Sequence, residues 1–491
     1  MDTAAAVPPG TTGDTADQTA AAAEPSPLRS RAAALRNPRL DPYWLAGALF
    51  VAYTTLSVCR YRRMATMSWD LGIFEQAIRA YAHLQAPVAD LKGPGAHILG
   101  DHFSPVTALV APFYRVFPTP VTLLVVQAAL FALSAVPVAR LAAHLLGRGR
   151  GLLIGVAYGL SWGIQRAVDF DFHEIAFAMP LLAFALEAIV RERWYRAMLW
   201  TAPLVFVKED LGATVAAIGA VILFRSWGRR DARLSALAIG LAAFGVIASA
   251  LALGVVIPEF NGSGDYAYWK KMEGGEATAT IPLDTALRTL AWVLLPTAGL
   301  LALRSPLLLA AVPTLGWRFV SHDDHYWGTD WHYNAVLMPV VFLALVDAIH
   351  RTRRSRRPWL AAYARQLPVA VAAAGVALTS SLPLYGLTEP DTYRKPAAVA
   401  DAERVLGEIP DDATVEANVG PISRLTDRCR VFWVGDTRGI APDYIAMKED
   451  EPRTPQHMTD YARQLHPDEE YRLVGASGGV YVLKRVGGDR A

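Results

Sequence analysis

Long apolar stretches separated by short polar loops occupy most of the chain between residues 43 and 384. A helix that crosses a bilayer needs about 20 mainly apolar residues, within a range of about 17–25. About eleven segments approach this requirement, and the shorter ones could be re-entrant. They lie near residues 43–60, 121–141, 151–168, 175–190, 198–207, 211–224, 234–257, 287–303, 306–320, 335–349 and 361–384. The pattern predicts an all-α polytopic membrane protein.

The loops between these segments alternate in charge. One set is rich in arginine, at residues 148–150, 191–196, 225–233, 304 and 351–357, as is the segment before the first span. The other set carries acids, histidines and aromatic residues, and only Arg60, Arg62 and Arg63 depart from the pattern. Because cytoplasmic loops are enriched in Lys and Arg, the N-terminus is predicted to be cytoplasmic. The protein is predicted to lie in the plasma membrane. An odd number of spans then places the C-terminal part outside the cytoplasm.

Composition divides the chain into three parts. Residues 1–41 are rich in Ala, Pro, Thr and Asp and are predicted to be a disordered cytoplasmic tail. Residues 42–388 form the multi-pass transmembrane domain. From residue 389 to 491 charged residues return and short strand patterns occur, with a hairpin turning at Gly478–Gly479. About 100 residues suffice for a small extracytoplasmic α/β domain.

Charge and cysteine content exclude several classes of protein. The net charge is +2, and topology explains the arginines, so no nucleic-acid partner is indicated. Cys59 and Cys429 are far apart in sequence and form no metal-binding spacing. Neither a structural disulfide nor a cysteine metal site is predicted.

The segment SWDLGIFEQ at residues 68–76 follows the first span. It is predicted to be a short helix in the outer membrane interface, with Trp69 and Phe74 as anchors. Asp70 at its start is either a helix cap, worth about 1 kcal/mol, or a functional acid. Glu75 lies five residues further on, about 140° around the helix, so the two carboxylates do not pair.

Two histidine-containing segments precede later spans. In HILGDHFSP, His97, Asp101 and His102 could bind phosphate or contribute to a metal site, and ordinary interfacial residues are the alternative. In DFDFHE, four ionisable groups crowd into six residues at a membrane boundary, which is costly unless they are paired or hydrated. Asp171, His173 and Glu174 are therefore candidate functional residues, and a solvated loop is the alternative.

Lys208, Glu209 and Asp210 interrupt a stretch that is otherwise apolar from residue 198 to 224. Charged residues at such a boundary are functional by default. Lys208 could bind a phosphate, which Glu209 and Asp210 could orient, or the two acids could bind a cation. The alternative is a tight hairpin that leaves all three in water.

The loop HDDHYWGTDWHY at residues 322–333 concentrates histidines, aspartates and aromatic residues. Its spacing matches no standard zinc motif, although His325 is a candidate ligand beside Asp171 and His173 for a divalent metal. Trp331, His332 and Tyr333 are candidates for substrate binding, because aromatic rings stack on the apolar faces of sugars. An aromatic belt at the membrane surface is the alternative.

The order WDLGIFEQ, HFSP, DFHE, KED and an outer His/Tyr loop resembles the DUF2079 family of prokaryotic multi-pass membrane proteins, over residues 43–384. That family is distantly similar to polyprenyl-phosphate-dependent glycosyltransferases of the GT-C fold. The resemblance implies a GT-C-like arrangement of the helices. Such enzymes carry an essential acid in the first outer loop, and Asp70 occupies that place here.

These observations favour an inverting glycosyltransferase at the outer membrane face, transferring a hexose or pentose from a lipid-linked donor to a cell-envelope acceptor. Asp70 would be the catalytic base. The residues expected to bind substrate or phosphate are Lys208, Glu209, Asp210, His102, His173, Glu174, Trp331, His332 and Tyr333. The alternatives are a transporter or flippase of a polar or lipid-linked solute, with the charged segments as an ion relay, and a non-catalytic envelope-assembly protein.

Overall fold

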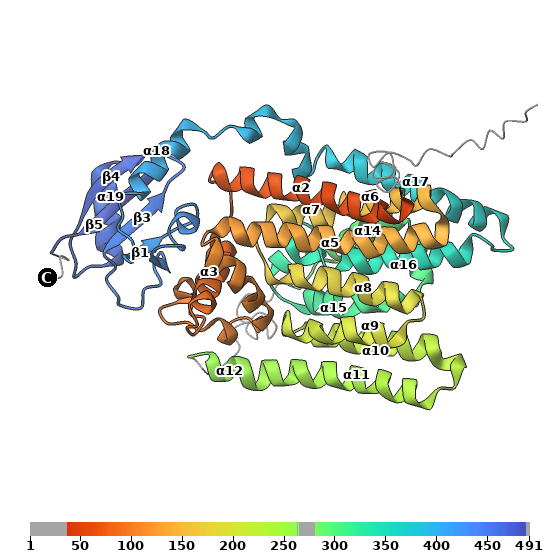
Figure 1. Ribbon diagram of the computed structural model, residues 1–491. Coiled ribbons are helices and arrows are strands. Elements are labelled where there is room, and N and C mark those ends of the chain that lie inside the picture. The colour runs from red at the N-terminus through yellow and green to blue at the C-terminus, as the bar shows by residue number, and fades with distance from the viewer. Residues whose placement is uncertain (1–36, 263, 265–279, 488–491) are drawn as a thin grey trace, which may run out of the picture. The chain divides into compact units, whose positions relative to one another are not determined.

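The computed structural model describes residues 37–262, 264 and 280–487. Residues 1–36 of the predicted cytoplasmic tail therefore lie outside the described residues. The described residues from Asp41 onward form one compact unit. It contains a helical region, a short segment around α3 (Trp69–Ala82), and a C-terminal sheet (Figure 1).

Each apolar segment of the sequence contains helix. The helices are α2 (Asp41–Arg62), α5 (Pro120–Leu146), α6 (Arg148–Gly159), α7 (Trp162–Asp169), α8 (Ala178–Val190), α9 (Trp194–Thr201), α10 (Leu211–Ser226), α11 (Ala232–Leu251), α14 (Leu283–Ala298), α15 (Val312–Val320), α16 (Leu337–Thr352) and α17 (Pro358–Thr379). Within the described residues, 6 helical segments are long and apolar enough to cross a membrane. The predicted all-α polytopic fold is confirmed, whereas the count of about eleven crossings stays a prediction.

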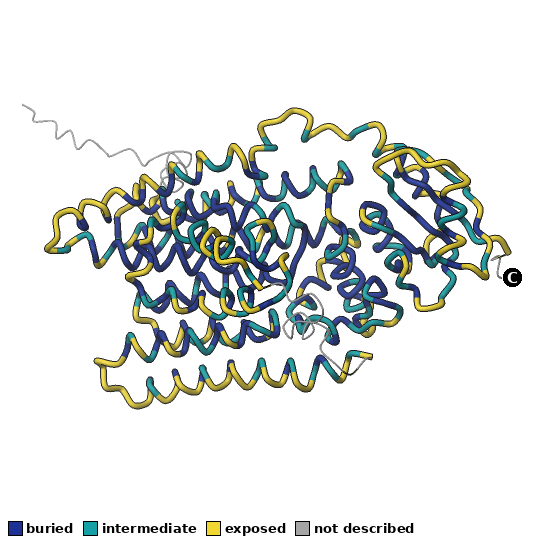
Figure 2. Tube along the Cα trace, turned by 180° about the vertical axis from the view of Figure 1, so that it is seen from behind, coloured by how far each residue is buried: buried dark blue, intermediate teal, exposed yellow. Residues whose placement is uncertain are grey.

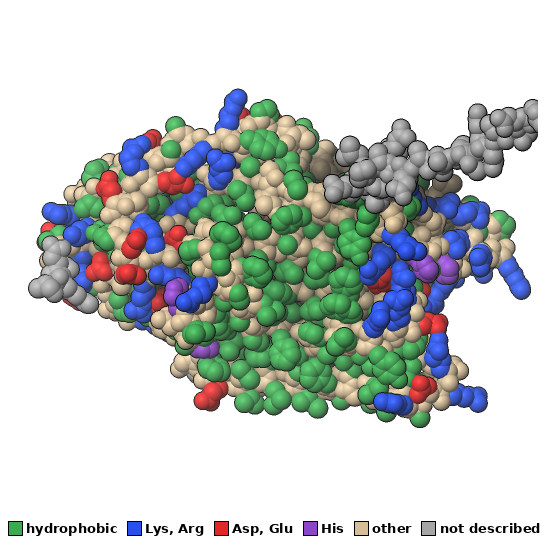
Figure 3. Space-filling view, in the orientation of Figure 1, with side chains coloured by type: hydrophobic (Ala, Val, Ile, Leu, Met, Phe, Trp, Pro, Cys, Tyr) green, Lys and Arg blue, Asp and Glu red, His purple; other side chains and the backbone are tan. Residues whose placement is uncertain are grey.

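The interior and the surface of the helical region are both apolar. In the segment His332–Thr352, which contains α16, 94% of an 18-residue stretch is buried, and Figure 2 shows buried positions through the centre of the bundle. In Ala232–Phe260, which contains α11, only 17% of such a stretch is buried, so its apolar side chains face outward. Figure 3 shows hydrophobic side chains over the middle of this region. Exposed apolar surface on this scale is typical of contact with lipid.

Small residues allow α10 and α11 to pack closely. A Cβ atom at Gly212 would clash with the backbone of Gly245, and one at Gly245 would clash with the backbone of Gly212. Close approach through small residues is the usual way in which transmembrane helices associate. This contact fixes the start of α10, which directly follows the Lys208–Asp210 segment.

The C-terminal region is a five-stranded sheet with two helices. The strands are β1 (Thr414–Ala417), β2 (Arg430–Trp433), β3 (Tyr444–Lys448), β4 (Tyr471–Ser477) and β5 (Val480–Arg485), in the order β2-β1-β3-β5-β4. β1 is parallel to β2 and β3, and β5 is antiparallel to β3 and β4. The helices are α18 (Ala397–Leu406) and α19 (Pro455–Leu465). Gly478 and Gly479 both have positive φ and form the predicted β4–β5 turn.

This sheet shares a hydrophobic core with α3. Ile73 and Ala77 of α3 belong to the same buried cluster as Val415 and Val431 of the sheet. Gly72 lies so close to Ile422 that a Cβ there would clash with the isoleucine side chain. The predicted boundary near residue 389 therefore marks a change from long helices to a sheet, and not a break between compact units.

The prediction that Trp69 and Phe74 anchor α3 in the membrane interface is wrong. Phe74 is 1% exposed and packs edge-on against Phe172, with ring centroids 5.5 Å apart. Trp69 packs edge-on against Trp433, with centroids 4.4 Å apart. Phe74 is therefore part of the core of the helical region, and Trp69 packs on the C-terminal region. Large exposed apolar residues occur instead further along the chain, at Leu109, Phe113, Val116 and Phe117.

Glu75 is a fully buried carboxyl group between α3 and the C-terminal region. Tyr114 donates a hydrogen bond to it at 2.9 Å, and Thr426 donates another. Burial and the nearby Asp427 raise the pKa of Glu75 to about 8. The folded protein therefore holds a proton that the unfolded chain releases at lower pH.

We expect the thermal unfolding temperature to fall as pH rises from 5 towards 9. Because the pKa of Glu75 is higher in the folded protein than in the unfolded chain, its protonated form stabilises the fold. This contribution is complete below the pKa of the unfolded chain and is lost as the pH rises through about 8. The slope contributed is at most about 1.4 kcal/mol per pH unit. Glu75→Gln should flatten this dependence in a thermal melt series, and the exposed Glu451→Gln should not. An unchanged slope in Glu75→Gln would contradict the assignment.

Candidate active site

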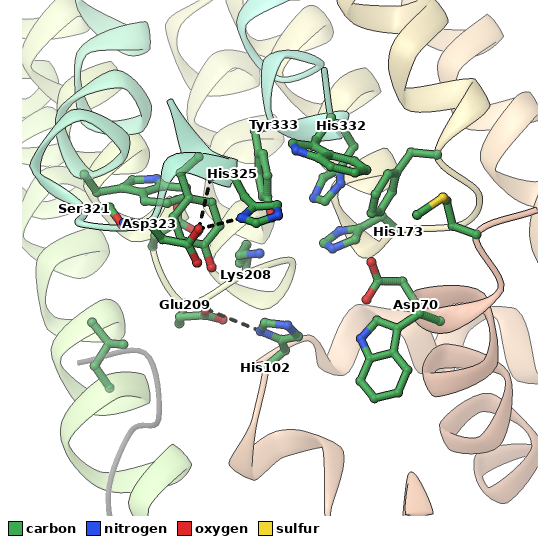
Figure 4. A pocket seen from close by; sticks show the side chains of 18 residues that line it. Asp70, His102, His173, Lys208, Glu209, Ser321, Asp323, His325, His332 and Tyr333 are labelled. Atoms are coloured by element: carbon green, nitrogen blue, oxygen red, sulfur yellow. Dashed lines mark hydrogen bonds and ion pairs between the residues drawn. The ribbon is translucent and has the colours of Figure 1, made fainter. Parts of the chain in front are cut away.

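One cavity of ≈ 540 Å³ collects most of the sequence-predicted residues. Its wall is built from the start of α3 and from four loops that are distant in sequence (Figure 4). The lining residues are Met67, Trp69, Asp70, His102, Phe170, His173, Lys208, Glu209, Asp210, Leu253, Trp317, Ser321, Asp323, His325, Tyr326, Trp331, His332 and Tyr333. Of the predicted site residues, only Asp171 and Glu174 lie behind this wall.

The loops meet here because helices end at one level of the bundle. His173 follows α7, and Lys208 lies in the break between a short 3-10 helix (Ala202–Phe206) and α10. His332 and Tyr333 immediately precede α16. Each polar motif is therefore held between two packed helices, which limits its movement. Leu253 comes from a π-helical turn (Ala252–Val256) that continues α11, a feature often found at functional sites.

Lys208 belongs to a buried ionic network. Its Nζ lies 3.2 Å from Oε1 of Glu174, and Nδ1 of His173 lies 2.6 Å from Oε2 of the same carboxylate. Burial alone would raise the pKa of Glu174, but His173 and Lys208 outweigh it and hold the pKa well below its usual value. Burial would lower the pKa of Lys208, yet Glu174, Glu209 and Asp210 keep it well above its usual value. Lys208 is therefore a fixed cation at the cavity wall.

His332 faces the cavity with both ring nitrogens unpaired within the described part of the chain. The residue is 3% exposed, and neither ring nitrogen has a hydrogen-bond partner among the described residues. Its ring stacks on His173, with centroids 3.8 Å apart, and touches Phe170 and Tyr333 at 4.4 and 4.2 Å. A buried imidazole without a partner costs free energy, so this ring is available to a bound ligand.

His102 and Glu209 line another part of the cavity. Nδ1 of His102 lies 3.8 Å from Glu209 Oε1, and the backbone N–H of Phe103 donates to Glu209 Oε2 at 3.2 Å. Burial would raise the pKa of Glu209, but His102 and Lys208 lower it below its usual value. Burial raises the pKa of Asp210 to about 6, against the opposing effect of Lys208. Both acids are therefore mainly ionised near neutral pH, and Asp210 takes up a proton first as the pH falls through about 6.

Asp70 lies in the first turn of α3 and projects into the cavity (Figure 4). The N-cap of α3 is Ser68, and its side chain makes no capping hydrogen bond. Among the described residues, the carboxylate of Asp70 has no hydrogen-bond or ion-pair partner. It can therefore accept a proton or a hydrogen bond from a ligand.

Arg318 organises the His/Trp loop and was missed by the sequence analysis. The side chain is fully buried in α15 and donates to the carbonyls of Tyr326 and Gly328 at 2.7 and 2.9 Å. It also donates to Oδ1 of Asn334 at 2.9 Å. An arginine inside the apolar run at residues 306–320 was the available signal, because such charges are rarely without purpose.

The structure does not bring Asp171, His173 and His325 together as a metal site. The Asp171 carboxylate accepts the backbone N–H of Ser68 at 2.9 Å instead. His325 lies beside Asp323 and Asp324, and these three are the group of described residues whose ligand atoms lie close enough to hold a metal, within 4.8 Å of one another. Asp324 and His325 are exposed, so this group is a surface feature at the cavity rim.

The cavity joins three chemical capacities. Lys208 and the histidines offer positive charge and hydrogen-bond donors, which suits a phosphate group. Asp70 offers a carboxylate to which no other described residue is bonded. The aromatic rings of Trp69, Trp331 and Tyr333 offer flat apolar faces. Together they fit a ligand that contains a phosphate and a sugar.

Comparison with known proteins agrees with this architecture. The family model of the predicted membrane proteins DUF2079 matches residues 60–482. No curated protein matches the chain. ArnT from Cupriavidus metallidurans bound to undecaprenyl phosphate is similar in structure, with a TM-score of 0.56 and 13% identity, over 90% of this chain and 98% of that one. ArnT in the apo state gives 0.51 and 12%, over 89% and 98%. The expected GT-C-like fold is confirmed.

Proposed function

We propose, from the premise that the chain belongs to the DUF2079 family of predicted membrane proteins, that it is an inverting glycosyltransferase. Its donor would be a hexose or pentose carried on a polyprenyl phosphate, and its acceptor a hydroxyl of the cell envelope. The reaction would occur at the outer face of the plasma membrane. The fold shared with ArnT, solved with undecaprenyl phosphate, supports a lipid-linked donor.

One observation carries the proposal. Lys208, His332 and Asp70 line the same cavity, and neither His332 nor Asp70 has a side-chain partner among the described residues. A cation and a free imidazole on one side suit a departing phosphate, and a free carboxylate suits a general base. A structural role would not require two such groups to stay unpaired in a partly buried site.

In the proposed reaction each of these groups has one role. Asp70 takes the proton from the acceptor hydroxyl as its oxygen attacks the anomeric carbon of the sugar. The bond from that carbon to the phosphate oxygen breaks on the opposite side, which inverts the configuration. Polyprenyl phosphate leaves with the bonding electron pair, and Lys208 and His332 stabilise its charge. Trp331 and Tyr333 hold the sugar ring.

The polyprenyl chain would remain in the lipid while its phosphate occupies the cavity. Leu253 brings the π-helical turn of the lipid-exposed α11 segment to the cavity wall, which offers an apolar approach from the membrane. A divalent cation could bind at the rim on Asp323, Asp324 and His325. No step of the proposed reaction depends on it.

The test is sugar transfer by the purified protein in vesicles. Undecaprenyl phosphates carrying radiolabelled hexoses and pentoses are supplied together with cell-envelope fractions as acceptor. The proposal requires label on the acceptor and an equal amount of free undecaprenyl phosphate. Label that crosses the bilayer while still attached to its lipid would instead establish a transporter or flippase.

The outer-face location requires the C-terminal region to lie outside the cytoplasm. The arginine-rich loops and the odd number of predicted spans favour this orientation. A reporter enzyme that works only in the cytoplasm, fused after Ala491, is expected to be inactive in cells. The same reporter fused before Asp41 is expected to be active. Activity of the C-terminal fusion would overturn the orientation and the outer-face site with it.

A further inference from the structure

The start of α3, which carries Asp70, is held by two residues in strained backbone conformations. Ser68 has φ 56° and Asp171 has φ 81°, both in the left-handed region. Such a conformation is energetically unfavourable for a residue with a side chain and persists only where its surroundings determine it. Both residues are buried, at 0% and 3% exposure, so packing and hydrogen bonds must supply the constraint.

Two hydrogen bonds supply it, and we call them the Ser68 bridge. The backbone N–H of Ser68 donates to Oδ2 of Asp171 at 2.9 Å. The backbone N–H of Gly420, in the C-terminal region, donates to Oγ of Ser68 at 2.9 Å. The residue that precedes the Trp69–Asp70 pair is therefore tied to the helical region on one side and to the C-terminal region on the other.

Both ends of the Ser68 bridge are firmly placed. Gln127 of α5 donates to the carbonyl of Asp171 and accepts the N–H of His173 at 2.9 Å. On the other side, Gly420 has φ 104°, and a Cβ there would lie 2.8 Å from Cδ of Lys448. The loop that carries His173 into the cavity therefore also holds Ser68 in place. The wall with Asp70 and the wall with His173 thus depend on the same loop.

We infer that Asp171 and Ser68 are positioning residues that set the Asp70 carboxylate relative to the His173 and Lys208 wall of the cavity. Through the hydrogen bond from Gly420 to Ser68, the C-terminal region also helps to position Asp70. The kinetic side of the inference rests on the proposed glycosyltransferase function. It also gives Asp171 a role different from the metal ligation expected of it.

The chemistry of Asp171 fits hydrogen-bond acceptance. Burial, only partly offset by the Ser68 N–H, raises the pKa of Asp171 to about 7. Either protonation state leaves an oxygen for the Ser68 N–H, and so does an asparagine amide. Asp171→Asn should therefore preserve the bridge, while Asp171→Ala removes it.

The experiment compares these two variants in the full-length protein. Asp171→Ala is expected to lower kcat by about 10–10²-fold, because small displacements of a reacting group cost that much. KM for an undecaprenyl-phosphate sugar should stay within about twofold, since the phosphate contacts are intact. Asp171→Asn should retain kcat within about threefold, because the amide oxygen of asparagine can accept the same hydrogen bond from the Ser68 N–H. Asp169→Asn is the control, because Asp169 pairs with Arg60 at 2.8 Å and does not line the cavity.

Amide hydrogen exchange provides a second measurement that needs no activity. Exchange in the peptide containing residues 68–72 should accelerate in Asp171→Ala and stay at the wild-type rate in Asp171→Asn. Unchanged exchange in Asp171→Ala would overturn the bridge. Faster exchange with normal kcat would overturn its positioning role, and loss of activity in Asp171→Asn at normal exchange would show that Asp171 acts chemically. A wild-type protein that transfers no sugar would refute the proposed function separately.

Discussion

Asp70→Asn is expected to lower kcat for sugar transfer by about 10²–10⁴-fold while the protein stays inserted and abundant. The amide keeps the size and polarity of the carboxylate but cannot take a proton from the acceptor. Binding of undecaprenyl phosphate should change little, because Lys208 and His332 are untouched. The measurement is steady-state transfer together with binding of undecaprenyl phosphate to the purified variant.

The competing explanation is that Asp70 only stabilises the N-terminus of α3. Asn caps helices about as well as Asp, so a structural role would tolerate the change. Asp284 is the matched control, since it is also a first-turn acid but lies in α14, outside the cavity. Asp284→Asn should leave transfer unchanged. Wild-type turnover in Asp70→Asn would remove Asp70 from the mechanism.

Lys208→Met is expected to abolish transfer, with a loss of at least about 10²-fold in kcat, because the departing phosphate loses its fixed cation. The variant also leaves Glu174 buried without its ammonium partner. Breaking a buried pair costs about 3–5 kcal/mol, so lower abundance is expected as well. Transfer must therefore be measured per mole of folded protein, with abundance followed by quantitative blotting of membranes.

A second variant separates folding from function. Lys208→Met combined with Glu174→Gln removes both members of the 3.2 Å pair, so the Glu174 carboxylate is no longer buried without its ammonium partner. Abundance should therefore rise above that of Lys208→Met while transfer stays lost. Lys395→Met, which removes a pair with Glu403 far from the cavity lining, is the control and should be active. Normal transfer by the double variant would show that Lys208 does not contact the ligand.

The apolar pattern of the sequence predicted the helices well, because lipid contact and burial both demand apolar side chains. It could not predict where helices break. The apolar segment at residues 151–168 is divided between α6 and α7, which are separated between Gly159 and Trp162. It also could not show that Trp69 packs on Trp433, a partner more than 300 residues away. Composition alone therefore placed α3 in the membrane interface and not in a protein core.

The motifs predicted the cavity because ionisable groups at membrane boundaries need a partner or water. Their individual roles depended on side-chain direction. Asp171 and His173 are two residues apart, yet one faces Ser68 and the other the cavity. The left-handed backbone conformation of Asp171 accounts for the different directions of the two side chains, and the sequence does not show which residue adopts that conformation. Arg318 was overlooked although its charge interrupts an apolar run, because two of its three partners are backbone carbonyls, which leave no pattern in the sequence.

The long-range tie between Ser68 and Gly420 has a consequence for biosynthesis. The two residues are 352 positions apart, so the ribosome completes Gly420 long after Ser68 has left the exit tunnel. At about 5–20 residues per second, the interval is roughly 20–70 s. Throughout it, the segment that follows α2 lacks its tie to the C-terminal region, although Asp171 is already present to accept the Ser68 N–H. A nascent chain can thus insert most of its helices before this tie forms, and a chain that ends before Gly420 cannot form it.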